Sequence, residues 1–187
     1  MDGYVIRAVR GDEWQRVKEL RLDALRDPAA PIAFLETVEQ ARARPDAVWR
    51  ERAEGVSHGR PARQFVAEAP GGSWVGSVTV LVEEGGTVDF FERPVERAQG
   101  HVVGVFLRNG QRGAGLGEAL FGAALGWAWS LREPALECVR LFVHEENARA
   151  EAFYRRIGFR ASGLVVPVPG DASAREREYV FPRPAGG

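Results

Sequence analysis

Residues 102–117 of the chain read VVGVFLRNGQRGAGLG. A β-branched run is followed by a short polar turn, and glycines at positions 113, 115 and 117 then open an apolar stretch. Glycine lets backbone N–H groups approach a bulky anion without a Cβ in the way, and a helix N-terminus adds unpaired donors and the positive end of a dipole. The stretch therefore predicts a strand, a pyrophosphate-binding turn and the start of a helix.

The residues that follow agree with this interpretation. Apolar side chains recur at helical spacing from Leu116 to Leu131, and the pattern stops before Pro134. A second apolar run, CVRLFV at 138–143, leads through the polar residues HEEN to a helical stretch at 148–157 that Gly158 closes. Two strand-to-helix units thus follow one another along the chain.

Two other phosphate-binding patterns fit the glycines poorly. A P-loop requires Lys and then Ser or Thr after its last glycine, whereas Gly117 is followed by Glu118 and Ala119. The dinucleotide fingerprint requires G-x-G-x-x-G and an acidic residue about 20 positions further on. The glycines are spaced differently, Glu145 lies somewhat too far along, and the chain holds too few strand-to-helix units for a doubly wound sheet.

A third pattern, Arg-x-x-Gly-x-Gly, is met by Arg112, Gly115 and Gly117. It stands in FLRNGQRGAGLGEAL, and RLFVHEENARAEAFYRRIGF follows at the spacing of the same family pattern. Here the sequence resembles the GCN5-related N-acetyltransferase (GNAT) family, closely over residues 102–163 and more weakly toward both ends. One departure is Asn109-Gly110, where many members carry Pro-Glu. This change makes the turn looser without removing a phosphate-facing N–H.

The resemblance implies how the donor acetyl-CoA is bound. A strand with free N–H and C=O groups can pair with the pantetheine amides as another strand would. In the family, the residues matching 105–107 make these contacts and supply an N–H to the oxyanion, while the glycine turn wraps the pyrophosphate. Asn147 either caps the helix that it precedes or contacts the cofactor. The expected cofactor-binding residues are Val105, Phe106, Leu107, Arg112, Gly113, Ala114, Gly115, Leu116, Gly117, Asn147 and Tyr154.

Acetyl transfer to an amine needs an acid for the departing thiolate and a route for the ammonium proton. Tyr154 lies one turn before Gly158, and the tyrosine at this position in the family is the usual general acid; the alternative is a packing role in the core. Histidine titrates near neutral pH, which makes His144, at the end of the second strand, the first candidate for the base. Many family members use a water chain instead, and the other candidates are Glu68, Glu83, Glu84, Asp89, His101 and Glu145.

The composition is typical of one soluble domain. The 187 residues are 45% apolar, enough to bury a core, and the formal charge of −1 offers no general attraction to nucleic acid or anionic membranes. No run of about 18 apolar residues occurs, and the start of the chain lacks a signal-peptide pattern, so we expect a cytoplasmic protein. Cys138 is the single cysteine, which excludes an internal disulfide, and the histidines form no cluster at zinc spacing, so no metal is expected.

The periodicities predict the order of the elements. Strands are expected at 4–9, 63–69, 74–82, 102–107, 138–143, 159–166 and 175–181. Helices are expected at 13–26, opened by a capping box of Asp12 and Gln15, then near Thr37, and at 45–55, 116–131 and 148–157. We expect one α/β (α+β type) domain over residues 1–187 with the GNAT fold, a mixed sheet of about seven strands with helices on both faces, and a cofactor-binding core at about 101–163. The polar segment 83–100 has no assigned structure.

The pattern and the resemblance together predict an N-acetyltransferase. Acetyl-CoA is the expected donor, and a primary amine, either a small molecule or a protein N-terminus, is the expected acceptor in a ternary complex. No nucleic acid or membrane is involved, and the protein would be a monomer or homodimer. The alternative is a non-catalytic acyl-CoA-binding or sensor module with the same fold, and the presence of Tyr154 favours the enzyme. A dehydrogenase, the remaining option, would bind NAD.

Overall fold

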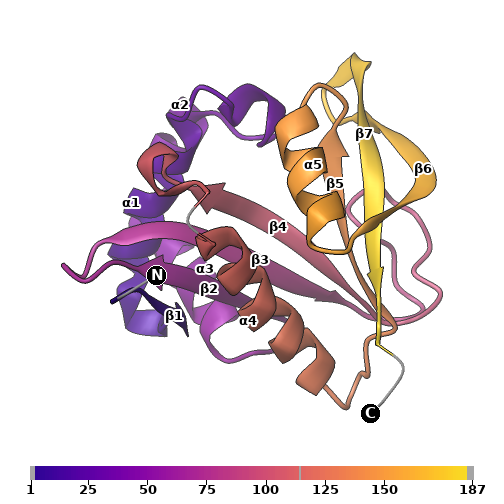
Figure 1. The fold of residues 1–187 in the computed structure, drawn as a ribbon, viewed down its shortest axis with the longest axis horizontal. Coiled ribbons are helices and arrows are strands. Elements are labelled where there is room, and N and C mark those ends of the chain that lie inside the picture. Colours follow the sequence, from indigo (N-terminus) through magenta and orange to yellow (C-terminus); the bar gives the residue numbers. More distant parts are fainter. Residues whose placement is uncertain (1–2, 114, 185–187) are drawn as a thin grey trace. The chain divides into compact units, whose positions relative to one another are not determined.

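The computed structural model describes residues 3–113 and 115–184. The chain divides into two compact units, residues 1–81 with 103–126 and residues 82–102 with 127–187. The described strands form a seven-stranded sheet in the order β1-β2-β3-β4-β5-β7-β6 (Figure 1). The strands are β1 (Val5–Ala8), β2 (Ala62–Glu68), β3 (Trp74–Glu83), β4 (Gln99–Leu107), β5 (Cys138–His144), β6 (Arg160–Val168) and β7 (Asp171–Pro182).

The helices are α1 (Trp14–Leu25), α2 (Val38–Ala43), α3 (Asp46–Ser57), α4 (Leu116–Ser130) and α5 (Ala148–Arg156), with 3-10 turns η1 (Gly11–Glu13), η2 (Ala30–Ile32) and η3 (Asn109–Gln111). Strand β4 runs parallel to β5, and β1–β2, β2–β3, β5–β7 and β6–β7 pair antiparallel. The expected mixed sheet is confirmed, and each expected strand and helix is present to within a few residues. None of the helices in the described part of the chain is both long and apolar enough to cross a bilayer.

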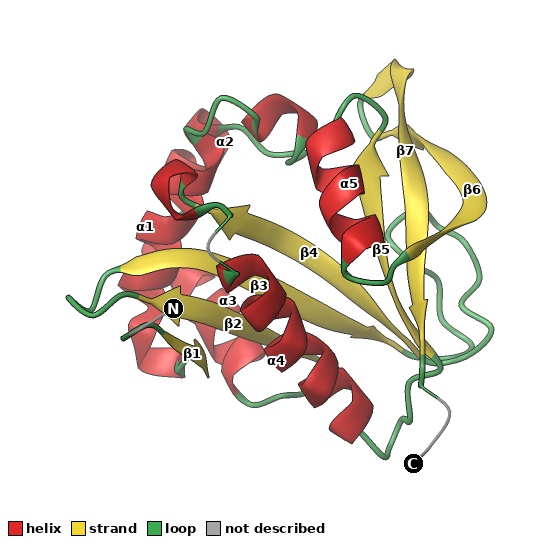
Figure 2. Ribbon diagram, in the orientation of Figure 1, coloured by secondary structure: helices red, strands yellow, loops and turns green. Residues whose placement is uncertain are grey.

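The core of the first unit is built by the apolar stripes of α1 and α3, which lie over the strands β1 to β3 (Figure 2). Leu20 of α1 and Trp49 of α3 are buried in one cluster with Val66 of β2 and Phe106 of β4. Burying a side chain of this kind stabilises the fold by about 1.5–3 kcal/mol. The stripes therefore fix which side of each helix faces the sheet.

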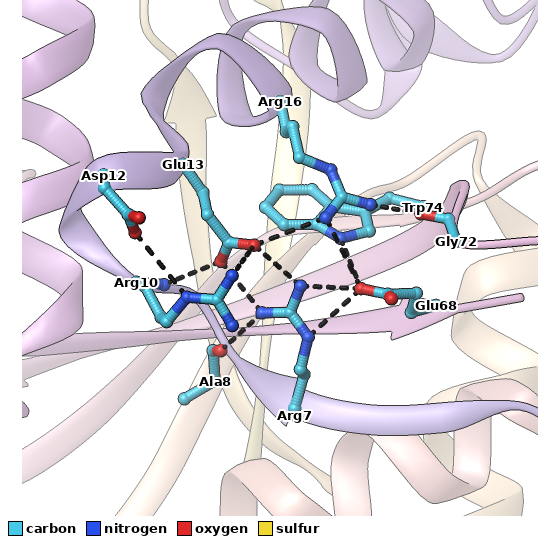
Figure 3. Close-up of polar contacts among 9 residues, drawn as sticks. All are labelled: Arg7, Ala8, Arg10, Asp12, Glu13, Arg16, Glu68, Gly72 and Trp74. Atoms are coloured by element: carbon cyan, nitrogen blue, oxygen red, sulfur yellow. Dashed lines mark hydrogen bonds and ion pairs between the residues drawn. The ribbon is translucent and has the colours of Figure 1, made fainter.

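A charged network joins β1, β2 and the start of the first helix (Figure 3). The guanidinium of Arg7 donates to both carboxylate oxygens of Glu13, at 2.8 and 2.7 Å, and to Glu68 at 2.6 Å. The guanidinium of Arg16 lies over the indole of Trp74, 4.3 Å from the ring centroid. Glu13 is buried yet charged, because the hydrogen bonds from Arg7 lower its pKa to about 2.

The expected capping box of Asp12 and Gln15 is wrong. Instead, the Glu13 carboxylate accepts the backbone N–H of Arg10 at 2.9 Å, and because an arginine side chain has no acceptor, no reciprocal side-chain bond completes a capping box. Because Glu13 turns inward to meet Arg7, the 3-10 turn η1 precedes α1. An ion pair with a neighbouring strand thus outweighs the local capping preference that the sequence pattern measures.

Replacing Glu13 by glutamine should destabilise the protein strongly at pH 7 and much less at pH 3. The folded state lowers the pKa of Glu13 from 4.5 to about 2, so its stabilising effect is complete above pH 4.5 and is lost as the pH falls toward 2. The full effect is about 2–3 kcal/mol. Urea unfolding of the wild type and the variant at both pH values measures it, with the exposed Glu19→Gln as control. A difference in unfolding free energy that does not depend on pH would contradict this assignment.

In the second unit, α5 covers one face of β5 and β7 (Figure 1). On that face lie Leu141 of β5 and its register partner Tyr179 of β7, both buried, and the Tyr179 hydroxyl donates to Glu151 of α5 at 2.7 Å. Because successive side chains of a strand point to opposite faces, Arg140, Phe142 and His144 lie on the other face. The last strand of the sheet, β6, pairs with β7 with two shifts of register, between Ala161 and Val165 and between Pro167 and Val168.

Residues 84–98, which the sequence left unassigned, fold over this other face. An isolated bridge between Val88 and Pro94 closes a tight turn. The buried carboxylate of Asp89 caps the turn by accepting the backbone N–H groups of Phe91 and Arg93, at 2.8 and 2.9 Å. Its second oxygen accepts a bond from Arg140 of β5 at 2.8 Å. A buried ion pair therefore holds a segment that has no apolar periodicity.

Candidate functional site

Strand β4 breaks its regular conformation just before the residues expected to meet pantetheine. Gly104 has φ +62°, a conformation that side chains rarely adopt, and its carbonyl accepts the Ser77 hydroxyl at 3.2 Å. Val105 and Leu107 are half-buried, while Phe106 belongs to the core of the first unit. Of the three expected pantetheine contacts, Phe106 therefore also has a packing role in the core. A lone glycine inside a strand pattern is the signal for such a break, and Gly104 was missing from the expected site residues.

The glycine turn has the backbone of an anion-binding loop. Gly113 and Gly115 have φ +84° and +78°, a region that glycine enters without steric cost. Helix α4 begins at Leu116, and the Gly115 carbonyl accepts the backbone N–H of Ala119 at 3.0 Å. The N–H groups of Leu116 and Gly117 lie in the first turn, at the positive end of the helix dipole. The expected residue Ala114 lies outside the described residues.

The Arg112 side chain is held by the protein itself. Its Nε donates to the Leu107 carbonyl at 2.9 Å, and its guanidinium pairs with Asp27 at 2.6 Å. A further bond of 3.3 Å reaches the Asn109 side chain. Arg112 therefore fastens the turn to the end of β4, and a direct phosphate contact of its guanidinium stays a prediction.

Asn147 and Tyr154 both belong to α5 and its cap, in the second unit. The Asn147 side chain accepts the backbone N–H of Ala150 at 3.2 Å and so caps the helix; its cofactor contact stays a prediction. Tyr154 is 7% exposed, with its ring centroid 5.6 Å from that of Phe153 and 6.1 Å from that of Phe159. Burial raises the pKa of Tyr154. The phenol therefore keeps its proton at neutral pH, as a general acid must.

His144 already uses one ring nitrogen within the protein. Its Nδ1 accepts the backbone N–H of Glu146 at 3.2 Å, which places the proton of the neutral ring on Nε2. In this form the free side of the ring donates a hydrogen bond and cannot accept a proton. The arrangement favours a donor role for His144, and its assignment as the base stays a prediction.

Most of the other base candidates are engaged in ion pairs. The buried guanidinium of Arg140 bonds to Glu83 at 2.7 Å, to Asp89 at 2.8 Å and to Glu178 at 3.1 Å, and His101 bonds to Glu83 at 2.9 Å. Burial acts to raise the pKa of Glu83, but the contacts with His101 and Arg140 outweigh it and lower that pKa overall. A carboxylate so stabilised is a weak base. The candidates engaged in this way, with Glu68 in the Arg7 network, are Glu68, Glu83, Asp89 and His101.

Cys138 is half-buried and burial raises the pKa of its thiol, which makes it a poor nucleophile. Within residues 3–113 and 115–184, no group of three or more His, Cys, Asp or Glu side chains is arranged to hold a metal ion.

An open cavity of about 720 Å³ lies in the second unit beside β6. Its walls are residues 90–93 of the turn and residues 165–172 of the β6–β7 hairpin. Phe90 and Val165 line it and remain 62% and 50% exposed, and the charged residues Glu92, Arg93 and Asp171 also contribute to its walls. The cavity therefore offers apolar surface to a ligand.

A comparison with protein-family models matches residues 14–159 to the acetyltransferase (GNAT) family. The chain belongs to this family. Its members take an acetyl group from acetyl-CoA, which is therefore the co-substrate of this GNAT acetyltransferase. A comparison with curated protein sequences finds no significant match.

Solved structures of other acetyltransferases share the fold. The ribosomal-protein-S5-alanine acetyltransferase from Vibrio fischeri is 15% identical, with a TM-score of 0.69 over 98% of this chain and 95% of that one. Arabidopsis thaliana NAA60 in complex with acetyl-CoA is 16% identical, with a TM-score of 0.68 over 97% and 99%. A spermidine N-acetyltransferase SpeG chimera from Vibrio cholerae and hSSAT is 18% identical, with a TM-score of 0.66 over 97% and 96%.

Proposed function

We propose that the protein is an N-acetyltransferase that moves the acetyl group of acetyl-CoA directly to a primary amine. The observation that carries the proposal is the turn at 113–117, where two glycines of positive φ lead into the N-terminus of α4 directly after β4. Such a turn presents several N–H donors to one diphosphate without a Cβ between them. The amides of pantetheine would pair with backbone groups of β4 before it, as another strand would.

Each step of the reaction has a candidate residue. A backbone N–H at 105–107 would stabilise the negative charge that develops on the thioester oxygen, and such a donor lowers the barrier by roughly 3 kcal/mol. Tyr154 would protonate the departing sulfur, because its phenol is held in the neutral form. The acetyl group itself comes from the co-substrate, and the protein contributes position and protons.

The acceptor class is a primary amine, and a small molecule or a protein N-terminus both fit it. The structurally similar proteins include one named for spermidine and one named for an alanine of a ribosomal protein. We propose a cytoplasmic location for the chain, because its composition and single cysteine are typical of proteins there.

Coenzyme A and acetyl-CoA should raise the melting temperature, whereas NAD and ATP should not. A ligand at 100 times its Kd stabilises the folded state by about 2.7 kcal/mol, which for a chain of this length corresponds to roughly 5–10 °C. Differential scanning fluorimetry measures the shift, and calorimetry gives the Kd. Equal stabilisation by NAD would contradict the proposed cofactor site.

A panel of amines then separates an enzyme from a sensor. Spermidine, free amino acids and a peptide with an N-terminal alanine are incubated with acetyl-CoA, and release of the free thiol is followed. Turnover with any of them supports the enzyme. Binding of coenzyme A without thiol release from any amine would indicate a non-catalytic acyl-CoA-binding module.

A further inference from the structure

Glu176 lies in the middle of the antiparallel group formed by β5, β7 and β6. Its register partners are His144 on β5 and Val166 on β6, and directly opposed residues of antiparallel strands share a face. The next pair along, Glu145 and Arg175, is joined by a backbone bond of 2.9 Å. His144 and Glu176 therefore form a non-hydrogen-bonded pair, whose Cβ atoms stand about 4.5–5.5 Å apart.

The Glu176 carboxylate has no partner in the described part of the chain: it makes no hydrogen bond and no ion pair, although it is half-buried. By contrast Glu178, two residues along on the same face, is bound by Arg140 at 3.1 Å and by Ser162 at 2.6 Å. Burial raises the pKa of Glu176, and the nearby imidazoles of His144 and His101 only partly offset this effect. A desolvated carboxylate without a partner is costly to the fold, and such groups concentrate at functional sites.

The groups around Glu176 leave it as the proton acceptor on this face. Nδ1 of His144 accepts the Glu146 N–H, so the His144 ring presents a proton on Nε2. The segment 84–98 contributes Asp89 to the same face, and Arg140 neutralises it. Neither register partner of Glu176 is a lysine or arginine, so no fixed cation competes with a ligand for the carboxylate.

A cavity lies beside the strand pair that carries this carboxylate; its lining combines apolar side chains with the charged Glu92, Arg93 and Asp171, and Glu176 is not itself a lining residue. Val166, the β6 partner of Glu176, is one of the residues that line the cavity of about 720 Å³ beside Phe90 and Phe91. Because Val166 and Glu176 share a face, the carboxylate flanks the wall of the cavity. A molecule whose apolar part lies in the cavity would carry its amine toward Glu176.

We infer that Glu176 receives the ammonium group of the acceptor and takes its proton, while the cavity holds the apolar part of the same molecule. The inference rests on the proposed function. An N–H bond of the ammonium breaks and an O–H bond forms on Glu176; the lone pair of the free amine then forms the C–N bond as the C–S bond of the thioester breaks. Tyr154 gives its proton to the sulfur and regains one from solvent, and the second proton of the nitrogen and the proton on Glu176 both pass to solvent.

The test compares Glu176→Gln with the wild type, using phenylethylamine as an apolar amine and ethanolamine as a polar one. At pH 7, kcat/KM of the wild type should be higher for phenylethylamine than for ethanolamine. Glu176→Gln should lower kcat/KM for phenylethylamine about 100-fold. The difference in kcat/KM between variant and wild type should shrink steadily toward pH 9.5, because the free amine then forms in solution without a base. Affinity for coenzyme A should not change. Glu146→Gln, an exposed acid nearby, is the matched control and should keep its activity.

The outcomes separate this inference from the proposed function. Suppose that the wild type acetylates amines. If Glu176→Gln has the same kcat/KM, or if its kcat/KM is reduced by the same factor at every pH, Glu176 is not the base, and the proposed function stands. If the wild type acetylates no amine, the proposed function fails, and carboxyl ¹³C NMR still decides on Glu176. A raised titration midpoint that moves when phenylethylamine is added supports an ammonium site, whereas an ordinary glutamate titration overturns it.

Discussion

Replacing Arg140 by methionine should lower the free energy of unfolding by about 3–5 kcal/mol, the usual cost of removing one partner from a buried ion pair. Arg140 holds three carboxylates within 3.1 Å, and its side chain is only 5% exposed. Methionine has a similar length but no charge. Glu83, Asp89 and Glu178 would then stay buried close together without a cation.

Chemical unfolding at pH 7 measures this loss, and Arg97→Met is the matched control. Arg97 forms an ion pair with Glu137 at 2.6 Å, but its side chain is 73% exposed, so its loss should cost less than about 1 kcal/mol. Burial acts to raise the pKa values of Glu83 and Asp89, but the bonds from His101 to Glu83 and from the Arg93 N–H to Asp89, together with the contacts of Arg140, lower both overall. Protonation of these acids at low pH should therefore reduce the difference in unfolding free energy between the wild type and Arg140→Met. An equal decrease in unfolding free energy for Arg140→Met and Arg97→Met would show that the charged groups around Arg140 are already hydrated.

Replacing Tyr154 by phenylalanine should lower kcat about 100-fold, the lower end of the range for general acids. The ring and its packing against Phe153 and Phe159 are kept, and only the proton donor is removed. The expected effect is at the lower end because water can replace the phenol in part. The Kd for acetyl-CoA should stay the same, since the loss lies in the step that releases the thiolate.

Tyr179→Phe is the matched control for this experiment. Tyr179 is fully buried, and its hydroxyl donates to Glu151 at 2.7 Å. Removing this hydroxyl should lower the free energy of unfolding by about 1 kcal/mol and leave kcat unchanged. Steady-state kinetics and calorimetry on both variants decide the matter. An unchanged kcat for Tyr154→Phe would assign Tyr154 to the core, and a change in Kd alone would make it a cofactor contact.

The local features of the sequence predicted the fold well. The apolar periodicities located the strands and helices, and the glycines at 113 and 115 do adopt positive φ. The errors arise where a distant residue decides the local structure. Glu13 turns away from a simple cap to meet Arg7, and the turn around Asp89 is held by Arg140, which lies 51 residues further along the chain.

The candidate site was predictable only in part, for the same reason. A backbone cradle can be predicted from glycines and a helix start, because its geometry is local. The contacts of a side chain cannot be predicted in this way. Arg112 is held by Asp27, 85 residues away, and the neighbours of Glu176 are determined by the register of β5, β7 and β6. No short sequence window brings His144 and Glu176 together.

Strand β6 forms the last strand of the sheet, and its irregular pairing makes it a poor template for another strand. An edge strand is a template for aggregation because its outer N–H and C=O groups are unpaired. Here two register shifts interrupt the strand, and Pro167, which has no N–H, lies between them, at the start of the second. Proline is tolerated in a strand mainly at an edge. The wall of the cavity can therefore expose Val165 to a small ligand while offering a second chain no continuous row of partners.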